Sequence, residues 1–453
     1  MRIVLLVLAA ALAAPAAARA DVRIPLPRTL RGATYGGGQV LYATHRGDGP
    51  IQVVGAPRSG ALATLPAFSR DALVSLAANA GGYLVAVRDF EREFLAQGGY
   101  DGSLRTLVDC RAGGDPPGAE LTMSAGTVGF AIAGARCGTP APVDLVAPDG
   151  TITPVPGPVI HEDNLQLSYA EPFLSVTVVA GSDAGTVRVF DLADGTHRDF
   201  PAGYAGGSAL IVVRADGTLV VAPGDDVGQR HPRGLYVWEP GAPAPRLLTR
   251  NAEPFWWPFA SASEVLYPPN EPVDGQLGLA LTPLDGGPIR PAGAPGIGAP
   301  REALGLDGAT AVIGSFSCQG ELQVTLVETP SASRRPFGCP VRVTGRSAAT
   351  LGFTCRNGCR TRFELDQRST PAQPCSERAT SGEIPPPHPT CELLATVTLR
   401  LGPSSRARRV PLRLTDAGRL ARRRHVQLPV MLVMDDNHPG PELIGEPDRT
   451  LRF

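Results

Sequence analysis

The clearest structural unit in the sequence is residues 208–249, SALIVVRADGTLVVAPGDDVGQRHPRGLYVWEPGAPAPRLLT. It holds four short apolar segments, SALIVVRAD, GTLVVAPG, GLYVWEP and PRLLT, which are rich in β-branched residues. Segments of this length and composition, separated by loops that contain Gly and Pro, are typical of β-strands. The stretch therefore predicts one unit of four short strands joined by turns.

The same unit recurs along the chain at a nearly constant spacing. Turns between the third and fourth strands are expected at Ser59-Gly60, Asp101-Gly102, Asp149-Gly150, Asp194-Gly195, Gly241-Ala242, Asp285-Gly286 and Ser331-Ala332. Four of these turns are Asp-Gly, in which Gly supplies the positive φ that a type I′ hairpin turn requires. A period of about 45 residues is that of the four-stranded blades of a propeller.

The repeat predicts an all-β fold, a seven-bladed β-propeller over residues 21–345. The expected units are 30–70, 71–117, 118–160, 161–205, 206–254, 255–298 and 299–345. Residues 22–29 precede the first unit and could add a strand to the last one. Such a strand would close the ring and remove open sheet edges, which otherwise invite aggregation.

Composition bounds the function without naming it. The chain has 453 residues, 53 Gly, 46 Pro and a formal net charge of −1, which fits two or more globular units. All 42 basic residues are Arg, so sites that need a lysine, such as a phosphate-binding P-loop or a pyridoxal Schiff base, are excluded.

The first twenty residues, MRIVLLVLAAALAAPAAARA, read as an export signal that is cleaved before Asp21. The apolar run is too short for a membrane span, and no other stretch is long enough. We therefore expect a secreted, periplasmic or cell-wall-associated protein with no membrane span.

Eight cysteines suit disulfides in an exported chain. Pairing of nearest neighbours would give Cys110–Cys137, Cys318–Cys339, Cys355–Cys359 and Cys375–Cys391. The alternative is one zinc ion held by Cys355, Cys359, Cys375 and Cys391, which the expected compartment disfavours. No cofactor and no metal are expected.

The period stops near residue 345, and the last 108 residues have strand-like runs with a different texture, LLATVTLRLG, RARRVPLRLT and HVQLPVMLVMDD. They predict a small β-sandwich over 346–453 that contains disulfides. Residues 346–453 carry a net charge of +6, and residues 21–345 carry −9. The densest basic stretch runs from Arg406 to Arg424; a solvated sheet face explains it, and contact with an anionic wall polymer is the alternative.

Two phrases resemble known families. The run PRLLTRNAEPFWWPFASASEVLY (245–267), followed by LGLALTPLDGGPIRP, resembles the repeat of TolB-like and WD40-like propellers, although it lacks their Ser-Pro-Asp-Gly turn. The phrase RVPLRLTDAGRLARRRHVQLPVMLV resembles an immunoglobulin-like module of secreted actinobacterial proteins, in which one strand leads into another. These resemblances imply a binding platform in the cell envelope, with an Ig-like C-terminal module.

Candidate ligand-binding residues follow from propeller geometry, because loops between second and third strands meet the loops between blades at the channel mouth. The loop GDDVGQRHPRG (224–234) is the longest of these. Its composition favours a solvated turn rich in Gly and Pro; alternatively, its carboxylates could bind a cation or its arginines an anion. The Trp256-Trp257 pair could stack on a sugar or clamp a partner, or pack between blades. The candidates are Asp225, Asp226, Arg230, His231, Trp256, Trp257, His45 and Glu271.

Catalytic signatures are absent from the sequence: there is no Gly-x-Ser-x-Gly elbow and no His-Glu-x-x-His, so no catalytic residue is assigned. We expect a monomeric binding or scaffold protein whose channel-mouth loops engage a protein or glycan of the cell envelope, and no nucleic acid. The alternative is an extracellular hydrolase or lyase acting on carbohydrate or a lactone, with Asp225, Asp226 and His231 in the site.

Overall fold

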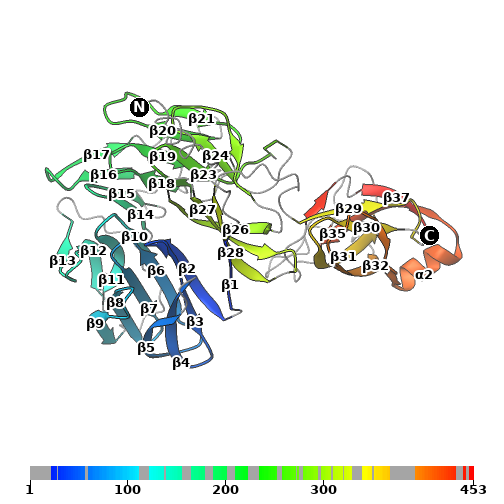
Figure 1. Cartoon of the computed structure of the whole chain (residues 1–453), viewed down its shortest axis with the longest axis horizontal. Helices are drawn as coiled ribbons and strands as arrows, with labels where there is room; N and C mark the ends of the chain where they lie inside the picture. Colours follow the sequence, from blue (N-terminus) through cyan, green and yellow to red (C-terminus); the bar gives the residue numbers. More distant parts are fainter. Residues whose placement is uncertain are drawn as a thin grey trace, which may run out of the picture.

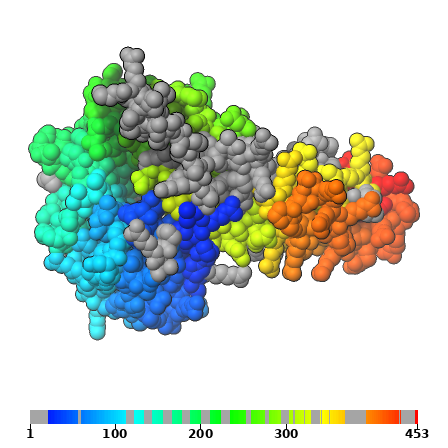
Figure 2. All heavy atoms as spheres, viewed as in Figure 1, coloured from blue at the N-terminus to red at the C-terminus, as the bar shows by residue number. Residues whose placement is uncertain are grey.

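The structure is a computed structural model of the chain. It describes residues 22–27, 29–56, 60–111, 122–136, 139–155, 165–178, 187–200, 210–222, 234–252, 258–271, 273–274, 279–293, 297–307, 310–319, 321–328, 339–348, 351–367, 393–434, 442–444 and 448–453. These residues are arranged as successive antiparallel sheets followed by a narrower C-terminal lobe (Figures 1 and 2).

Each expected unit of the first 300 residues forms one four-stranded sheet in chain order. The first two sheets contain β2 (Leu30–Gly36), β3 (Gln39–His45), β4 (Gly49–Ala56) and β5 (Gly60–Phe68), then β6 (Leu73–Ala78), β7 (Tyr83–Arg88), β8 (Arg92–Gly98) and β9 (Leu104–Arg111). The third contains β10 (Thr122–Ala125), β11 (Phe130–Arg136), β12 (Thr139–Val146) and β13 (Ile152–Pro154).

The next three sheets follow the same order. They contain β14 (Leu165–Ala170), β15 (Phe173–Val178), β16 (Val187–Asp191) and β17 (Thr196–Phe200), then β18 (Leu210–Val213), β19 (Leu219–Ala222), β20 (Leu235–Trp238) and β21 (Arg246–Thr249), then β22 (Phe259–Ala260), β23 (Glu264–Tyr267), β24 (Ala280–Pro283) and β25 (Arg290–Pro291). The stretch 208–249 thus supplies one whole sheet.

The last sheet of the ring is completed from the other end of the chain. Its order is β1-β28-β27-β26, in which β1 (Val22–Pro25) pairs antiparallel with β28 (Leu322–Glu328) beside β27 (Thr310–Ser317) and β26 (Ile297–Asp307). The expected closing strand in residues 22–29 is therefore present. Strand β1 occupies the outer, fourth position of this sheet. The sequence suggested that a strand after a turn at Ser331-Ala332 would fill this position; these two residues lie outside the described part of the chain.

The sheets are arranged around a common centre. Strand β2 contacts both β6 and β26, and β14 contacts β10 and β18, so that the first strands of the sheets lie side by side. Figure 1 shows these strands near the centre and the fourth strands at the rim. Apolar side chains fill the space between neighbouring sheets, for example Leu41 and Val53 with Tyr83 and Phe94. This is the arrangement of a β-propeller.

The Asp-Gly turns differ from the predicted type. Gly102, Gly150, Gly195 and Gly286 have positive φ, as expected, but the preceding aspartates do not, which excludes a type I′ turn. At Asp149 the carboxylate oxygen Oδ1 instead accepts a hydrogen bond of 2.9 Å from the amide of Thr151. The aspartate therefore holds the turn through its side chain, and the glycine alone takes the left-handed conformation.

The C-terminal lobe has two sheets with one shared core. One has the order β33-β30-β29-β36 and the other β34-β32-β31-β35-β37. Phe353 of the first and Phe363 of the second are fully buried in the same cluster. The strands are β29 (Pro340–Thr344), β30 (Gly352–Cys355), β31 (Cys359–Gln367), β32 (Leu393–Leu401), β33 (Arg408–Arg409), β34 (Arg413–Leu414), β35 (Gln427–Met434), β36 (Glu442–Ile444) and β37 (Asp448–Arg452).

Two local features of this lobe were not expected. Strand β29 pairs with β30 and β36, so residues just before the expected boundary at 345 belong to the C-terminal sheets. Between β34 and β35 lies helix α2 (Asp416–Arg423) where the sequence suggested a direct step from strand to strand. Thr415 caps this helix by accepting a hydrogen bond from the amide of Gly418, and Asp416 and Arg423 suit its two ends.

One disulfide connects the C-terminal lobe to the last sheet of the ring, and a second one lies within the lobe. Cys318, directly after β27, is bonded to Cys339, directly before β29. Cys355 is bonded to Cys359, so the zinc alternative is wrong because these two sulfurs are bonded to each other. These two expected pairs are confirmed; Cys110 is also in a disulfide, while Cys137, Cys375 and Cys391 lie outside the described residues. No helix in the described ranges is long and apolar enough to span a membrane.

Candidate functional site

Strand direction gives the ring two different faces. Because strands alternate, the connections between second and third strands and those between sheets lie at one end, called here the mouth face. The turns between first and second and between third and fourth strands lie at the other end, called here the turn face. The candidates from the sequence follow second strands or lie between sheets in the chain, at connections of the mouth face, except that His45 is the last residue of strand β3.

On the mouth face, the loops where the first two sheets meet are within the described part of the chain. Asp48, in the β3–β4 turn, accepts a hydrogen bond of 2.8 Å at Oδ1 from the amide of Arg70. Arg70 belongs to the connection between the two sheets and forms an exposed ion pair with Asp71, with 3.6 Å between Nε and Oδ2. The two loops are thus joined through backbone and side chain.

Asp89 organises the neighbouring β7–β8 turn. Its carboxylate is buried and accepts hydrogen bonds from the amides of Glu91 (2.9 Å) and Arg92 (2.8 Å) at Oδ1 and from Ser69 (3.1 Å) at Oδ2. Three backbone donors around one carboxylate fix the path of the turn. Phe90 stands at the tip of this turn with 61% of its surface exposed.

Arg92 anchors the other end of the same turn. Its Nε and Nη2 donate to the two carboxylate oxygens of Asp109 at 2.8 and 2.7 Å, and its guanidinium lies over the rings of Phe68 and Phe94. The hydrogen bonds from Arg92 hold the pKa of Asp109 below its ordinary value. Phe90 therefore lies on a turn that is held at both ends by hydrogen bonds, next to exposed charged residues.

His45 lies in this region but is used within its own hairpin. It is the last residue of β3, is 3% exposed, and its Nε2 is 3.0 Å from the carbonyl oxygen of Gly49. The exposed groups of the hairpin are those of Arg46 and Asp48. The structure thus places His45 beneath the mouth face, where it supports the turn.

Glu271 lies on the mouth face of the sixth sheet. Its amide donates to Oδ1 of Asn251 at 2.7 Å, and Nδ2 of Asn251 donates to its carbonyl oxygen at 3.1 Å. Asn270 adds a bond from its Nδ2 to the carbonyl oxygen of Ala252. These bonds join two loops and leave the Glu271 side chain exposed.

The remaining candidates lie outside the described residues: Asp225, Asp226, Arg230, His231, Trp256 and Trp257. Residues 223–233 connect β19 to β20, and residues 253–257 connect β21 to β22, so both segments belong to connections of the mouth face. Their participation in a site stays a prediction, and no described contact joins His45 to Glu271.

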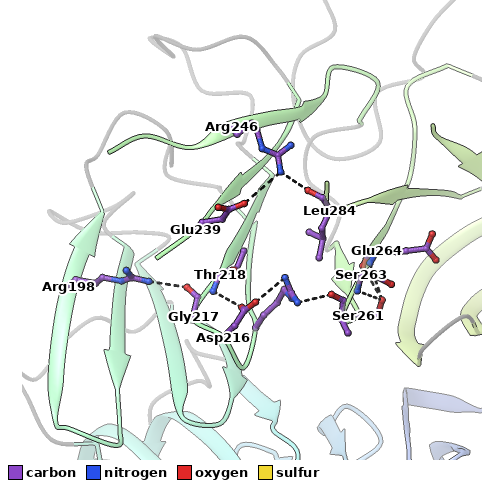
Figure 3. Close-up of polar contacts among 12 residues, drawn as sticks. Arg198, Asp216, Gly217, Thr218, Glu239, Arg246, Ser261, Ser263, Glu264 and Leu284 are labelled. Atoms are coloured by element: carbon purple, nitrogen blue, oxygen red, sulfur yellow. Dashed lines mark hydrogen bonds and ion pairs between the residues drawn. The ribbon is translucent and has the colours of Figure 1, made fainter. Parts of the chain in front are cut away.

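The turn face has a shallow polar hollow of about 330 Å³ between the fifth and sixth sheets. Its lining includes Arg214, and also Asp216, Thr218, Glu239 and Leu284, which Figure 3 labels. Arg214 donates from Nη2 to the carbonyl oxygen of Ala262 at 2.8 Å and lies 3.3 Å from Asp216. Oδ1 of Asp216 in turn accepts from the amide of Thr218 at 2.9 Å.

Arginines also connect the sheets around this hollow. Arg246 donates from Nη2 to the carbonyl oxygen of Leu284 in the next sheet at 2.6 Å, and Glu239 lies 3.9 Å from it. Arg198 donates to the carbonyl oxygen of Gly217, again in the next sheet, at 2.9 Å (Figure 3). Most polar groups around the hollow thus form hydrogen bonds between neighbouring sheets. The hollow therefore marks the joint between the fifth and sixth sheets, which means the place where these hydrogen bonds hold them together.

Asp89 and the turn-face arginines were not among the residues predicted from the sequence. Asp89 directly follows a strand in the run Asp89-Phe90-Glu91-Arg92, and an aspartate at that position often accepts from amides two and three residues later. That spacing was the available signal. The arginine contacts to the next sheet had no local signal, because each partner is a carbonyl oxygen 19 to 48 residues away.

Comparison with known proteins gives fold-level likeness only. No family model matches the sequence, and no curated protein matches it. Among solved structures, TolB from Acinetobacter baumannii aligns with a TM-score of 0.36 and 10% identity over 70% of this chain and 64% of its own. A puromycin-hydrolyzing peptidase from Mycobacterium tuberculosis aligns at 0.46 and 14% identity over 72% and 57%, and the β-propeller domain of the Trilobed protease from Pyrococcus furiosus at 0.45 and 12% identity over 68% and 99%. The chain thus spans less than two thirds of the first two of these proteins.

Proposed function

We propose that the protein is an exported binding scaffold: a seven-bladed propeller whose mouth face holds a protein partner in the cell envelope. The C-terminal lobe is then an Ig-like module that serves as a spacer or second contact. The leader-like first twenty residues and the disulfides support the location.

The observation that carries this proposal is the exposure of Phe90 on a turn held by Asp89. A large aromatic ring that is 61% exposed contributes apolar area on binding, and aromatic residues are enriched among the strongest contacts of interfaces. Because Asp89 already fixes the turn, a partner loses little free energy in ordering it.

The surroundings of Phe90 suit a protein surface. Glu91 follows it directly, and the exposed Arg70–Asp71 pair lies on the adjoining loop that Asp89 contacts through Ser69. An aromatic centre with a charged rim is the usual composition of a protein interface. The strands that flank residues 223–233 and 253–257 end on the same face, and in this proposal Asp225, Arg230 and Trp257 extend the contact.

The test compares two exposed apolar residues on opposite faces. A photoreactive phenylalanine analogue replaces Phe90 on the mouth face or Val128 on the turn face, which is 58% exposed, in the full chain. The proteins are irradiated with cell-envelope extract. We expect position 90 to cross-link one protein and position 128 to leave it unlabelled.

The identified partner is then purified and its affinity measured. Phe90→Ala should weaken binding about tenfold or more, whereas Val128→Ala should leave it within twofold. Equal affinities for wild type and Phe90→Ala would refute the proposal. If position 90 labels insoluble glycan and no protein, the proposed partner is a glycan and the proposal of a protein partner is wrong.

A further inference from the structure

The outer face of the five-stranded sheet in the C-terminal lobe gathers arginines from three strands. Arg360 of β31 lies directly opposite Arg400 of β32, Arg362 opposite Thr398, and Arg413 of β34 opposite Thr396. Directly opposite residues share a face of a sheet. The alternating residues, among them Phe363 and Val397, are buried in the core. The arginines therefore lie on the solvent side.

The Arg360–Arg400 pair is unusual because it places two like charges at opposed positions. Cβ atoms of such a pair lie about 5 Å apart, and like charges there destabilise the sheet. Both side chains are exposed, and within the described ranges no carboxylate contacts either guanidinium. Arg362, the next arginine on this face, lies 3.9 Å from Glu364 and so has an acidic neighbour.

The chemistry of two facing guanidinium groups selects a particular anion. A bidentate contact with one guanidinium uses two of the about four lone-pair positions of a carboxylate, and all of these positions lie in one plane, so a second guanidinium must enter that same plane. A tetrahedral phosphate directs its oxygens to more than one side, so it can accept from both arginines at once. It would also neutralise the repulsion between them.

The neighbouring groups continue the site along the strands. Thr398 offers an exposed hydroxyl beside Arg400, and Arg413 lies two residue pairs further along the same face. Two residues of a strand span roughly 6.6 Å, which places Arg413 about 13 Å from Arg400 along the strand. A linear polymer with repeating phosphates could contact both places.

We propose that Arg360 and Arg400 form a phosphate-binding site, and that its ligand is a phosphate group of a linear phosphate-bearing polymer. This site is separate from the mouth face. It differs from a diffuse basic surface because the two facing arginines form its centre.

The test measures binding of the full chain to three probes, inorganic phosphate, linear polyphosphate and anionic phosphatidylglycerol vesicles, at several salt concentrations. We expect the tightest binding to polyphosphate, and Arg400→Gln and Arg360→Gln each to weaken it about tenfold. Arg408→Gln is the matched control: it removes the same charge from an exposed position on the other sheet of the lobe, and should stay within twofold.

A second readout keeps the test informative if a variant is unstable. Without a polyanion, Arg400→Gln should melt at or above the wild-type temperature at low salt, because it removes the like-charge repulsion. Equal weakening by Arg408→Gln would overturn the proposal in favour of general basic charge. Binding to vesicles but not to polyphosphate would refute the claim that the ligand is a linear polymer. Failure to bind any of the three phosphate probes would refute the claim that Arg360 and Arg400 form a phosphate-binding site.

Discussion

The carboxylate of Glu171, in the turn between β14 and β15, accepts a hydrogen bond of 2.8 Å from the amide of Gly129 in the preceding sheet. It also accepts from the amides of Val128 and Thr127 of the same turn. One side chain thus satisfies three consecutive backbone donors across the boundary between two sheets. The contact belongs to the turn face, where it joins the third and fourth sheets.

Glu171→Gln should destabilise the ring. The substitution removes the charge that receives three amide hydrogen bonds and turns half of the acceptor into a donor. We expect a loss of about 1–3 kcal/mol in the free energy of unfolding, measured by denaturant titration. Asp71→Asn is the control, since Asp71 is exposed and, among the residues that the structure describes, pairs only with Arg70 across 3.6 Å. A Glu171→Gln variant as stable as the control would contradict this role.

The same contact predicts a pH dependence. Burial acts to raise the pKa of Glu171, but hydrogen bonds from the backbone amides outweigh it, and the folded pKa lies below the ordinary 4.5. A lowered folded pKa means that the stabilisation is complete above the unfolded pKa and disappears as pH falls through the folded one. From about pH 6 to 8, which is more than about one pH unit above 4.5, Glu171 is ionised in both the folded and the unfolded protein. The difference in melting temperature between wild type and Glu171→Gln should therefore be constant in that range and should shrink below about pH 4. A difference that grows in acid would contradict the assignment.

Ring closure depends on β1. Ile24 is 6% exposed and lies opposite Val324, whereas Val22 on the same strand is 45% exposed. Ile24→Ala should cost about 2–5 kcal/mol, and Val22→Ala less than about 1 kcal/mol. Thermal unfolding followed by circular dichroism separates the two. Similar small losses for both would mean that the ring is stable without its closing strand.

Arg246 should stabilise the joint between the fifth and sixth sheets. Arg246→Gln removes the hydrogen bond to the carbonyl oxygen of Leu284, and a cost of about 1–2 kcal/mol is expected. Arg250→Gln removes an exposed arginine nearby and serves as the control. Denaturant unfolding of both variants checks the prediction. Equal free energies of unfolding for Arg246→Gln and Arg250→Gln would mean that the Arg246 contact makes no net contribution to stability.

The Cys318–Cys339 disulfide should limit motion between the last sheet and the C-terminal lobe. Replacing both cysteines with serine removes the link across 21 residues, which for a loop of this size contributes about 3 kcal/mol. We expect faster proteolytic cleavage between residues 318 and 339 in the double variant. The Cys355→Ser/Cys359→Ser double variant, whose bridge spans four residues, is the control. Equal cleavage rates in the two variants would contradict the role of this bridge.

The repeat and the positions of its turns could be predicted from the sequence. Apolar runs between glycine-containing turns specify strands locally, so the unit at 208–249 and the positions of Gly102, Gly150, Gly195 and Gly286 were predicted correctly. The predicted turn type was wrong, because the aspartate side chain accepts a hydrogen bond from the amide two residues later and so fixes a different turn. Helix α2 was missed since its N-cap, Thr415, was interpreted as the end of a strand.

Tertiary structure decided what the side chains do. His45 and Glu271 were candidates by their place in a loop, but burial of one and exposure of the other depend on the neighbouring hairpins. Arg360 and Arg400 are forty residues apart, and only the pairing of β31 with β32 opposes them. The physical reason is that strand periodicity is local, whereas register, burial and contacts between sheets are set by chain segments distant in sequence.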